Sequence, residues 1–292
     1  MVTLDIHHRT CYRYREPISL GPHRMMLRPR ESCELRLIEF EVKTDPVAEI
    51  HWAQDVHGNT IATAIFNTPT DSLVIESTSR LRLDAAQWPV FDITASAAAF
   101  PFDYSADERL DLGAMLVREY PDPEGRLTAW ARAFVRGTPT DTLSLLSDLN
   151  AGIQAQIRYQ AREAEGTQSP ITTLDHRSGS CRDFAVLLVE AVRSLGFGAR
   201  IVSGYLHNAD GTMLGSADDG STHAWAEVYV PGAGWIAYDP TNLGVGGFSL
   251  IPVAVARSIG QTLPVSGSFA GTAEALETMS ASVRIEPAVK LD

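Results

Sequence analysis

The chain has 292 residues, which is too long for one small module and comfortable for two domains. Hydrophobic residues make up 45% of the chain and charged residues 21%, so it can bury a substantial core and is not intrinsically disordered. The net charge of −12 argues against non-specific binding to nucleic acid or to an anionic membrane surface.

No targeting or membrane-spanning segment is recognisable in the sequence. The first residues, Met1 to Asp5, lead into a polar stretch without the apolar region of a secretory signal. No apolar stretch approaches the ~18 to 20 residues that span a bilayer. The three widely spaced cysteines, Cys11, Cys33 and Cys181, form neither a disulfide framework nor a zinc motif. We therefore expect a cytoplasmic protein without metal or cofactor, in which a thiol stays reduced; its oligomeric state is left open.

The first part of the chain, residues 1–85, is predicted to form a β-sandwich-like domain. Short runs of alternating or β-branched residues are separated by turn signals such as Asp45-Pro46 and His57-Gly58-Asn59. The runs cover residues 35–42, 50–52, 60–66 and 72–83. Residues 86–105 are rich in Ala, Pro and Phe and are expected to form a linker.

The pattern then changes to helical spacing, and residues 106–245 are predicted to form a second domain. Two apolar stripes have helical periodicity, one formed by Leu127, Trp130, Ala131 and Phe134 and the other by Leu146, Leu149, Ile153 and Ile157. Thr138-Pro139 is the expected start of the second helix. Helices followed by strands indicate an α+β fold. Residues 246–292 are expected to form an extension whose strands pack back on either domain, with a Gly- and Ser-rich loop over residues 244–271.

The most informative helix lies within residues 178–196. Its apolar residues fall on one face, and Gly196 is a typical stop. Ser180 and Asp183 have the spacing of a capping box, which places Ser180 at the N-cap and Cys181 in the first helical position. The partial positive charge of that helix end favours the thiolate, so we expect the pKa of Cys181 to fall below the free value of about 8.5. The alternative is a small buried cysteine at a helix start.

Downstream, residues 222–239 are predicted to form a β-hairpin. His223, Trp225, Glu227 and Tyr229 alternate with apolar residues, and the turn at residues 231–234 leads into a return strand. If residue 225 lies opposite residue 239, Asp239 shares the face of His223 at roughly 7–8 Å between Cα atoms. A shift by one residue would turn Asp239 to the other face. We predict the register in which paired residue numbers sum to an even value.

Cys181, His223 and Asp239 have the residue types of a thiol acyl-transfer site. The thiolate attacks a carbonyl carbon, the imidazole pairs with the thiolate and protonates the leaving amine, and the carboxylate orients the imidazole. The product of this step is a thioester, which a second nucleophile resolves. Trp225 and Tyr205 are secondary candidates for contacts with the substrate, although packing in the core or the cleft wall is the simpler interpretation of Trp225.

Four sequence blocks carry a family resemblance: Gly179-Ser-Cys-Arg-Asp-Phe-Ala, Ala199-Arg-Ile-Val-Ser-Gly-Tyr, Thr222-His-Ala-Trp-Ala-Glu-Val-Tyr and Gly234-Trp-Ile-Ala-Tyr-Asp-Pro-Thr. They resemble the signature blocks of the transglutaminase-like superfamily. Through residues 8–14, 27–30 and 55–59, the chain more narrowly resembles bacterial transglutaminase-like cysteine protease candidates with an N-terminal β domain. The resemblance implies a papain-like core, in which a helix bundle bearing the cysteine packs on an antiparallel sheet. It also assigns the catalytic triad to Cys181, His223 and Asp239.

The resemblance leaves three points open. The side chain that completes the oxyanion hole is not fixed, and four residues upstream of the cysteine are candidates: Gln154, Gln156, Tyr159 and Gln168. Residues 251–260 depart from a family block that more often begins with His and ends with Gly-Arg-Asp, a departure that would alter the cleft rim. The Gly-containing loop at residues 207–221 is either a gate over the cleft or a disordered surface loop.

Hydrolysis of a peptide, isopeptide or other amide bond in a protein or peptide substrate is the favoured function. Amine transfer to a protein glutamine uses the same residues but requires water to be kept from the thioester. A non-enzymatic interaction module with a vestigial triad is the third hypothesis. A metal site on the three residues is the least supported, because nothing supplies a second pair of ligands.

Overall fold

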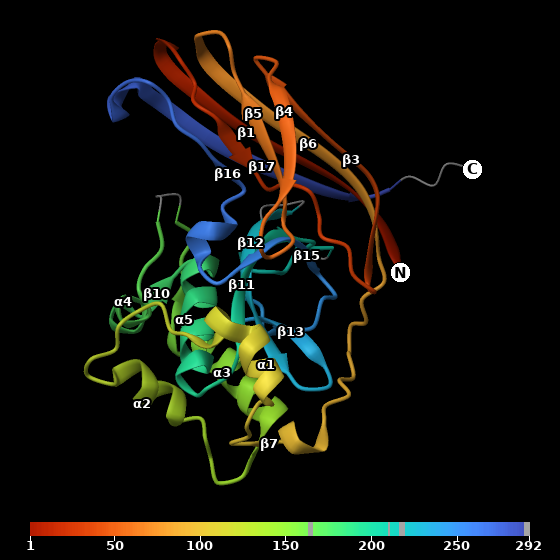
Figure 1. Cartoon of the computed structure of the whole chain (residues 1–292), viewed down its shortest axis with the longest axis vertical. Helices are drawn as coiled ribbons and strands as arrows, with labels where there is room; N and C mark the ends of the chain where they lie inside the picture. Colours follow the sequence, from red (N-terminus) through yellow and green to blue (C-terminus); the bar gives the residue numbers. More distant parts are fainter. Residues whose placement is uncertain (163–165, 210, 216–219, 289–292) are drawn as a thin grey trace.

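The computed structural model describes residues 1–162, 166–209, 211–215 and 220–288. The fold is mixed α+β, as predicted (Figure 1). Strands from both ends of the chain gather at one end of the molecule, the helices lie at the other end, and the sheet that holds β11, β12 and β13 lies between them.

Two antiparallel sheets make up the N-terminal part. The first has the strand order β17-β1-β6-β3, and the second has the order β16-β2-β5-β4. Tyr14, Ile75 and Met25 belong to the apolar cluster between them. The strands are β1 (Val2–Ile18), β2 (His23–Met25), β3 (Leu35–Asp45), β4 (Glu49–Gln54), β5 (Thr60–Ile65), β6 (Thr70–Leu83), β16 (Val265–Ser266) and β17 (Leu276–Pro287). Almost the whole of the C-terminal strand β17 pairs with residues 4–14 of β1, so the two ends of the chain complete one sheet.

A five-stranded sheet with the order β14-β13-β12-β11-β15 forms the centre of the second part. Its strands are β11 (Ala199–Leu206), β12 (Ser221–Val230), β13 (Gly234–Asp239), β14 (Gly244–Val245) and β15 (Leu250–Ala256). Two short pairs lie outside it, β7 (Ala99–Phe100) with β8 (Thr140–Asp141) and the parallel pair β9 (Arg158–Tyr159) with β10 (Ser178–Gly179).

Helices cover one face of this sheet. They are α1 (Ala106–Leu112), α2 (Arg126–Arg132), α3 (Thr142–Gln156), α4 (Pro170–His176) and α5 (Cys181–Ser194), with short 3₁₀ helices η1 (Ala95–Ala97), η2 (Gly113–Leu116), η3 (Ile259–Thr262) and η4 (Ala273–Ala275). Within the described ranges, none of the helices has both the length and the apolar character needed to cross a bilayer.

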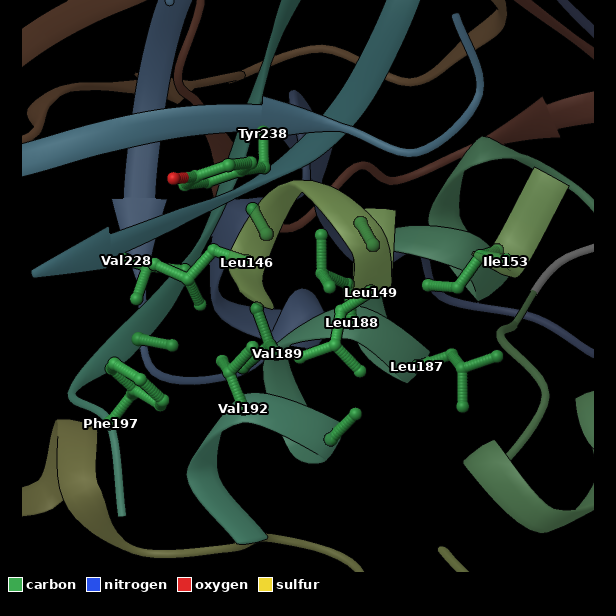
Figure 2. Close-up of a cluster of buried hydrophobic side chains, with 14 of the residues drawn as sticks. Leu146, Leu149, Ile153, Leu187, Leu188, Val189, Val192, Phe197, Val228 and Tyr238 are labelled. Carbon is green, nitrogen blue, oxygen red and sulfur yellow. The ribbon is translucent and has the colours of Figure 1, made fainter. Parts of the chain in front are cut away.

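The core of the second part is the contact between α3, α5 and the β12–β13 hairpin (Figure 2). Leu149 of α3 and Leu188 of α5 meet there, and Tyr238 of β13 covers them from the sheet. Each fully buried apolar side chain of this size contributes roughly 1.5–3 kcal/mol relative to an exposed one. The small residues Ala224 and Ala226 face the same cluster, and their size lets α5 approach β12 closely. This packing fixes the N-terminus of α5 against the sheet.

Two expectations from the sequence are wrong. The Gly- and Ser-rich stretch 244–271 contains β15, which pairs with β11 and is mostly buried, so this stretch is not simply a loop. Its continuous apolar run is typical of a strand that is covered on both faces. The helix that was expected to start at Thr138-Pro139 is α3, which begins later, at Thr142. Its N-cap is Asp141, whose side chain accepts a hydrogen bond from the backbone N–H of Ser144.

Polar contacts also join the two parts of the molecule. The side chain of Asn59, in the turn after β4, donates to the carbonyl of Val255 at 2.8 Å and accepts from its N–H at 2.9 Å. The hydroxyl of Tyr205 on β11 lies 3.0 Å from Nδ1 of His8 on β1. Both contacts are buried, and together with an apolar cluster around Leu81 and Ile251 they hold the N-terminal sheets against β11 and β15.

Candidate functional site

Cys181 occupies the first residue of α5, as the capping-box pattern predicts. Ser180 is the N-cap, and both its N–H and its hydroxyl donate to the Asp183 carboxylate at 2.8 and 2.9 Å. The helix continues for 14 residues and buries most of its side chains. The thiol is therefore held at the positive end of a rigid helix.

Asp183 does more than close the cap. Its carboxylate is fully buried and also accepts from the guanidinium of Arg162 at 2.8 Å and from the backbone N–H of Gln168 at 2.7 Å. These bonds tie the segment before α4 to the first turn of α5. Sequence reasoning assigned Asp183 only to the cap, and no spacing signal pointed to Arg162 as its partner.

His223 and Asp239 lie on the β12–β13 hairpin in the predicted register. Ala226 pairs with Tyr238 and Val228 with Ile236, so paired residue numbers sum to an even value. The pairing covers residues 226–230 of β12 and ends there. The backbone N–H of Ala224, just beyond it, donates to the sulfur of Cys181. The cysteine therefore meets the sheet where β12 and β13 separate.

The imidazole and the carboxylate form a buried pair. Nε2 of His223 lies 2.9 Å from Oδ2 of Asp239, and both side chains are almost completely excluded from solvent. Oδ1 of Asp239 accepts from the N–H of Thr241 at 2.9 Å, and Oδ2 also accepts from the carboxamide of Asn242 at 3.0 Å. Nδ1 of His223 is buried and is the ring nitrogen that Asp239 leaves to the side of the Cys181 thiol. That nitrogen is left free to exchange a proton with the nearby thiol.

The charges of the three groups support one another. Burial raises the pKa of the Cys181 thiol, but the hydrogen bond and the charge of His223 lower it by more, so the net shift of this pKa is downward. Burial lowers the pKa of His223, yet Asp239 and Cys181 raise it to about 10. Burial raises the pKa of Asp239, and His223, Asn242 and Thr241 bring it below its usual value. The arrangement therefore favours thiolate, imidazolium and carboxylate together.

Of the four candidates for the oxyanion side chain, Tyr159 is the one whose pKa responds to the charges of Cys181 and Asp239. Burial, followed by the charges of Cys181 and Asp239, raises its pKa to about 12, so it remains a hydrogen-bond donor. Gln154 donates to the carbonyl of Thr241. Gln168 donates to Ser178 and Asp183, so its NH2 group is engaged in the segment before α5, whereas the contact of Gln156 with Trp130 uses its carboxamide oxygen.

Trp225 and Tyr205 are both nearly fully buried. The ring of Trp225 stacks on that of His223, with 6.1 Å between centroids and an interplanar angle of 25°. Tyr205 bonds to His8 between the two parts of the molecule. Their burial gives no support to a substrate contact, and we assign both side chains to packing. Of the loop at residues 207–221, for which a gate and a surface loop were both left open, residues 210 and 216–219 lie outside the described residues.

The described part of the chain contains no group of three or more His, Cys, Asp or Glu side chains arranged to hold a metal ion.

Comparisons with known proteins cover both parts of the chain. Residues 4–82 match the bacterial transglutaminase-like N-terminal region, and residues 128–240 match the transglutaminase-like superfamily. An uncharacterised protein of Mycobacterium leprae is 25% identical over 279 residues, covering 93% of this chain and 94% of that protein. A protein-glutamine gamma-glutamyltransferase of Pseudomonas aeruginosa is 32% identical over 93 residues, covering 30% of this chain and 13% of that protein.

Among solved structures, one of a Cytophaga hutchinsonii protein described as a candidate cysteine protease has a TM-score of 0.75 at 19% identity. It covers 99% of this chain and 92% of that chain. The similarity extends over the N-terminal sheets as well as the helical part, so the two proteins share their whole fold.

Proposed function

We propose that this chain, which belongs to the transglutaminase-like superfamily through residues 128–240, is a cysteine hydrolase of peptide, isopeptide or other amide bonds. The observation that carries the proposal is the buried pair of His223 and Asp239 beside Cys181 at the N-terminus of α5. A thiolate needs a cation to stay ionised and a proton donor for the leaving amine, and the imidazolium supplies both.

The proposed reaction has two steps. The sulfur of Cys181 attacks the carbonyl carbon, and the carbonyl oxygen becomes an oxyanion beside the backbone N–H groups at the N-terminus of α5. Nδ1 of His223 then gives its proton to the departing amine, leaving a thioester. Water, deprotonated by the now neutral imidazole, attacks the thioester and releases the acid. Asp239 remains ionised throughout and orients the ring through Nε2.

Tyr159 completes the oxyanion site in this proposal. Its phenol is half-buried, stays protonated, and responds to the charges of Cys181 and Asp239. A neutral donor at the edge of a buried site stabilises developing negative charge without adding charge of its own.

Hydrolysis is tested by comparing amide and thioester turnover between the wild type and Cys181→Ala. We expect the variant to lose at least about 10³-fold in kcat/KM. The matched control is Cys33→Ala, since Cys33 is exposed on the N-terminal part. Equal turnover by the wild type and Cys181→Ala would remove the proposal.

Amine transfer is the second candidate. It is favoured by the local similarity to the Pseudomonas aeruginosa protein-glutamine gamma-glutamyltransferase and by the burial of His223 and Asp239, which limits access of water. Incorporation of a labelled primary amine into a glutamine-containing peptide distinguishes the two reactions. Hydrolysis alone, at high amine concentration, would exclude transfer.

A further inference from the structure

Asn242 connects two features that the proposed reaction leaves separate. It follows β13 by three residues and lies in the turn that begins at Pro240. Its Oδ1 accepts from the backbone N–H of Leu214 at 2.8 Å, and its Nδ2 lies 3.4 Å from the carbonyl of the same residue. A side-chain carboxamide therefore pairs with both backbone groups of one loop residue.

The same Nδ2 group donates to Oδ2 of Asp239 at 3.0 Å. That carboxylate oxygen is also the partner of His223. A carboxamide is planar, so its orientation toward Leu214 and its orientation toward Asp239 cannot change independently. The loop and the acid of the site are thus joined through one rigid group.

The loop is held at further points around the site. The carboxamide oxygen of Asn208 accepts from the N–H groups of Thr212 and Met213. Met213 packs against the apolar cluster that contains Trp225. Gly215 has a φ of +76°, and a Cβ added there would lie 2.6 Å from the hydroxyl of Tyr159. The described loop residues therefore contact Tyr159 on one side and Asn242 on the other.

We propose that Asn242 is a positioning residue that couples the loop around Leu214 to the orientation of Asp239. The inference rests on the proposed function, since it gives Asn242 a role in aligning the His223–Asp239 pair. When the loop is in this position, the backbone of Leu214 fixes the orientation of the Asn242 carboxamide, and the carboxamide fixes the orientation of the Asp239 carboxylate. Displacement of the loop frees the carboxamide to rotate, and Asp239 then loses a donor on the oxygen that holds His223.

Coupling of this kind is reciprocal. The first test therefore measures hydrogen exchange at the Leu214 amide, a readout that needs no enzyme activity. We expect Asn242→Ala to accelerate this exchange by tens of fold, because the amide loses its acceptor. We expect Asp239→Ala to accelerate it about fivefold or more, although Asp239 does not touch Leu214. The control is Thr241→Ala, which keeps the backbone bond to Asp239 and removes a buried hydroxyl that has no partner among the described residues.

The second test runs in the opposite direction and follows the pH profile of Cys181 alkylation by iodoacetamide. Leu214→Pro removes the N–H that Asn242 accepts, whereas Leu214→Ala keeps it and trims a side chain that is 43% exposed. We expect Leu214→Pro and Asn242→Ala to move the profile to higher pH and to lower the neutral rate at least fivefold. The double variant should be no slower than the slower single variant. Leu214→Ala should follow the wild type.

The two tests separate the outcomes. Wild-type exchange at Leu214 in Asp239→Ala would overturn the coupling, because Asn242 would then hold only the loop. The coupling would also be overturned if Leu214→Pro kept the wild-type alkylation profile while Asn242→Ala shifted it. Asn242 would then position Asp239 without any dependence on the loop. If wild-type Cys181 is no more reactive than Cys33, the proposed function fails, and the exchange measurement alone decides the coupling.

Discussion

The ionisation of Cys181 depends on more than its place at a helix N-terminus. Cys181 is partly buried, which opposes the thiolate, and the charge and hydrogen bond of His223 together with the N–H of Ala224 outweigh that effect. The imidazolium is itself sustained by Asp239. At the residue scale the protonation states of Cys181, His223 and Asp239 are thus coupled, and the loss of one of these groups changes the protonation of its neighbour.

The first prediction concerns the pH dependence of Cys181 alkylation. Because its pKa is lowered, the wild-type rate should rise with pH and reach its plateau before the ordinary thiol pKa. In His223→Ala, burial acts without the compensating cation, so the rise should move to higher pH. Mass spectrometry of the alkylated Cys181 peptide measures both profiles, with exposed Cys33 as the internal reference. Coincident profiles would contradict the pairing.

The second prediction concerns Tyr159. Replacement by Phe keeps the ring, which packs edge-on against Phe184 at 6.1 Å between centroids, and removes only the hydroxyl. If the phenol donates to the oxyanion, kcat/KM for an amide substrate should fall by about 10²-fold. Alkylation of Cys181, which forms no oxyanion, should change little. An equal loss in both reactions would show that Tyr159 acts on the thiolate instead.

At the element scale, local patterns predicted the site better than they predicted its surroundings. The capping box of Ser180 and Asp183 and the alternation around His223 are local rules that tertiary packing reinforces, and both were confirmed. Strands were expected in the C-terminal extension, but the position of β15 was not predicted, because its apolar run has no alternation and lies in a Gly-rich stretch. The contacts of Asn242 with Leu214 and of Arg162 with Asp183 join distant segments, and no periodicity encodes such contacts.

The third prediction concerns the first turn of α5. Asp183→Ala would leave Arg162 without its carboxylate, and the N–H groups of Ser180 and Gln168 without an acceptor. We expect a loss of about 3 kcal/mol in the free energy of unfolding, because the ion pair is buried on the Asp183 side. Chemical denaturation provides the measurement.

The control for this variant is Asp175→Ala, which breaks an exposed ion pair with Arg126 on the neighbouring helices. Exposed pairs contribute little, so its unfolding midpoint should stay near that of the wild type. Equal destabilisation by the two variants would mean that Asp183 is not the anchor of the helix start.

At the scale of the whole molecule, the N-terminal sheets and the helical part act as one structure. Strand β17 returns from the C-terminal side to pair with β1. On the opposite side of the interface, β15 links the sheet of the site to Asn59. Loss of these contacts would expose the apolar cluster around Leu81 and Ile251, so the N-terminal part supports the sheet that carries His223.

The fourth prediction tests this support at Asn59. Its side chain is fully buried and satisfies both backbone groups of Val255, while its oxygen also accepts from Arg30 at 2.7 Å. Asn59→Ala leaves the N–H and the C=O of Val255 buried and unpaired, and each such group costs about 1–3 kcal/mol. We expect urea unfolding to lose about 2–4 kcal/mol in total. The control is Asn67→Ala, an exposed asparagine just after β5.

If the two parts depend on each other, Asn59→Ala should also broaden the unfolding transition or divide it in two. Tryptophan fluorescence, to which buried Trp225 in the sheet of the site contributes, and far-ultraviolet circular dichroism should then give different midpoints. A single transition with the stability of Asn67→Ala would mean that the apolar contacts alone hold the parts together. In that case the paired amide of Asn59 would determine only how the sheets are aligned.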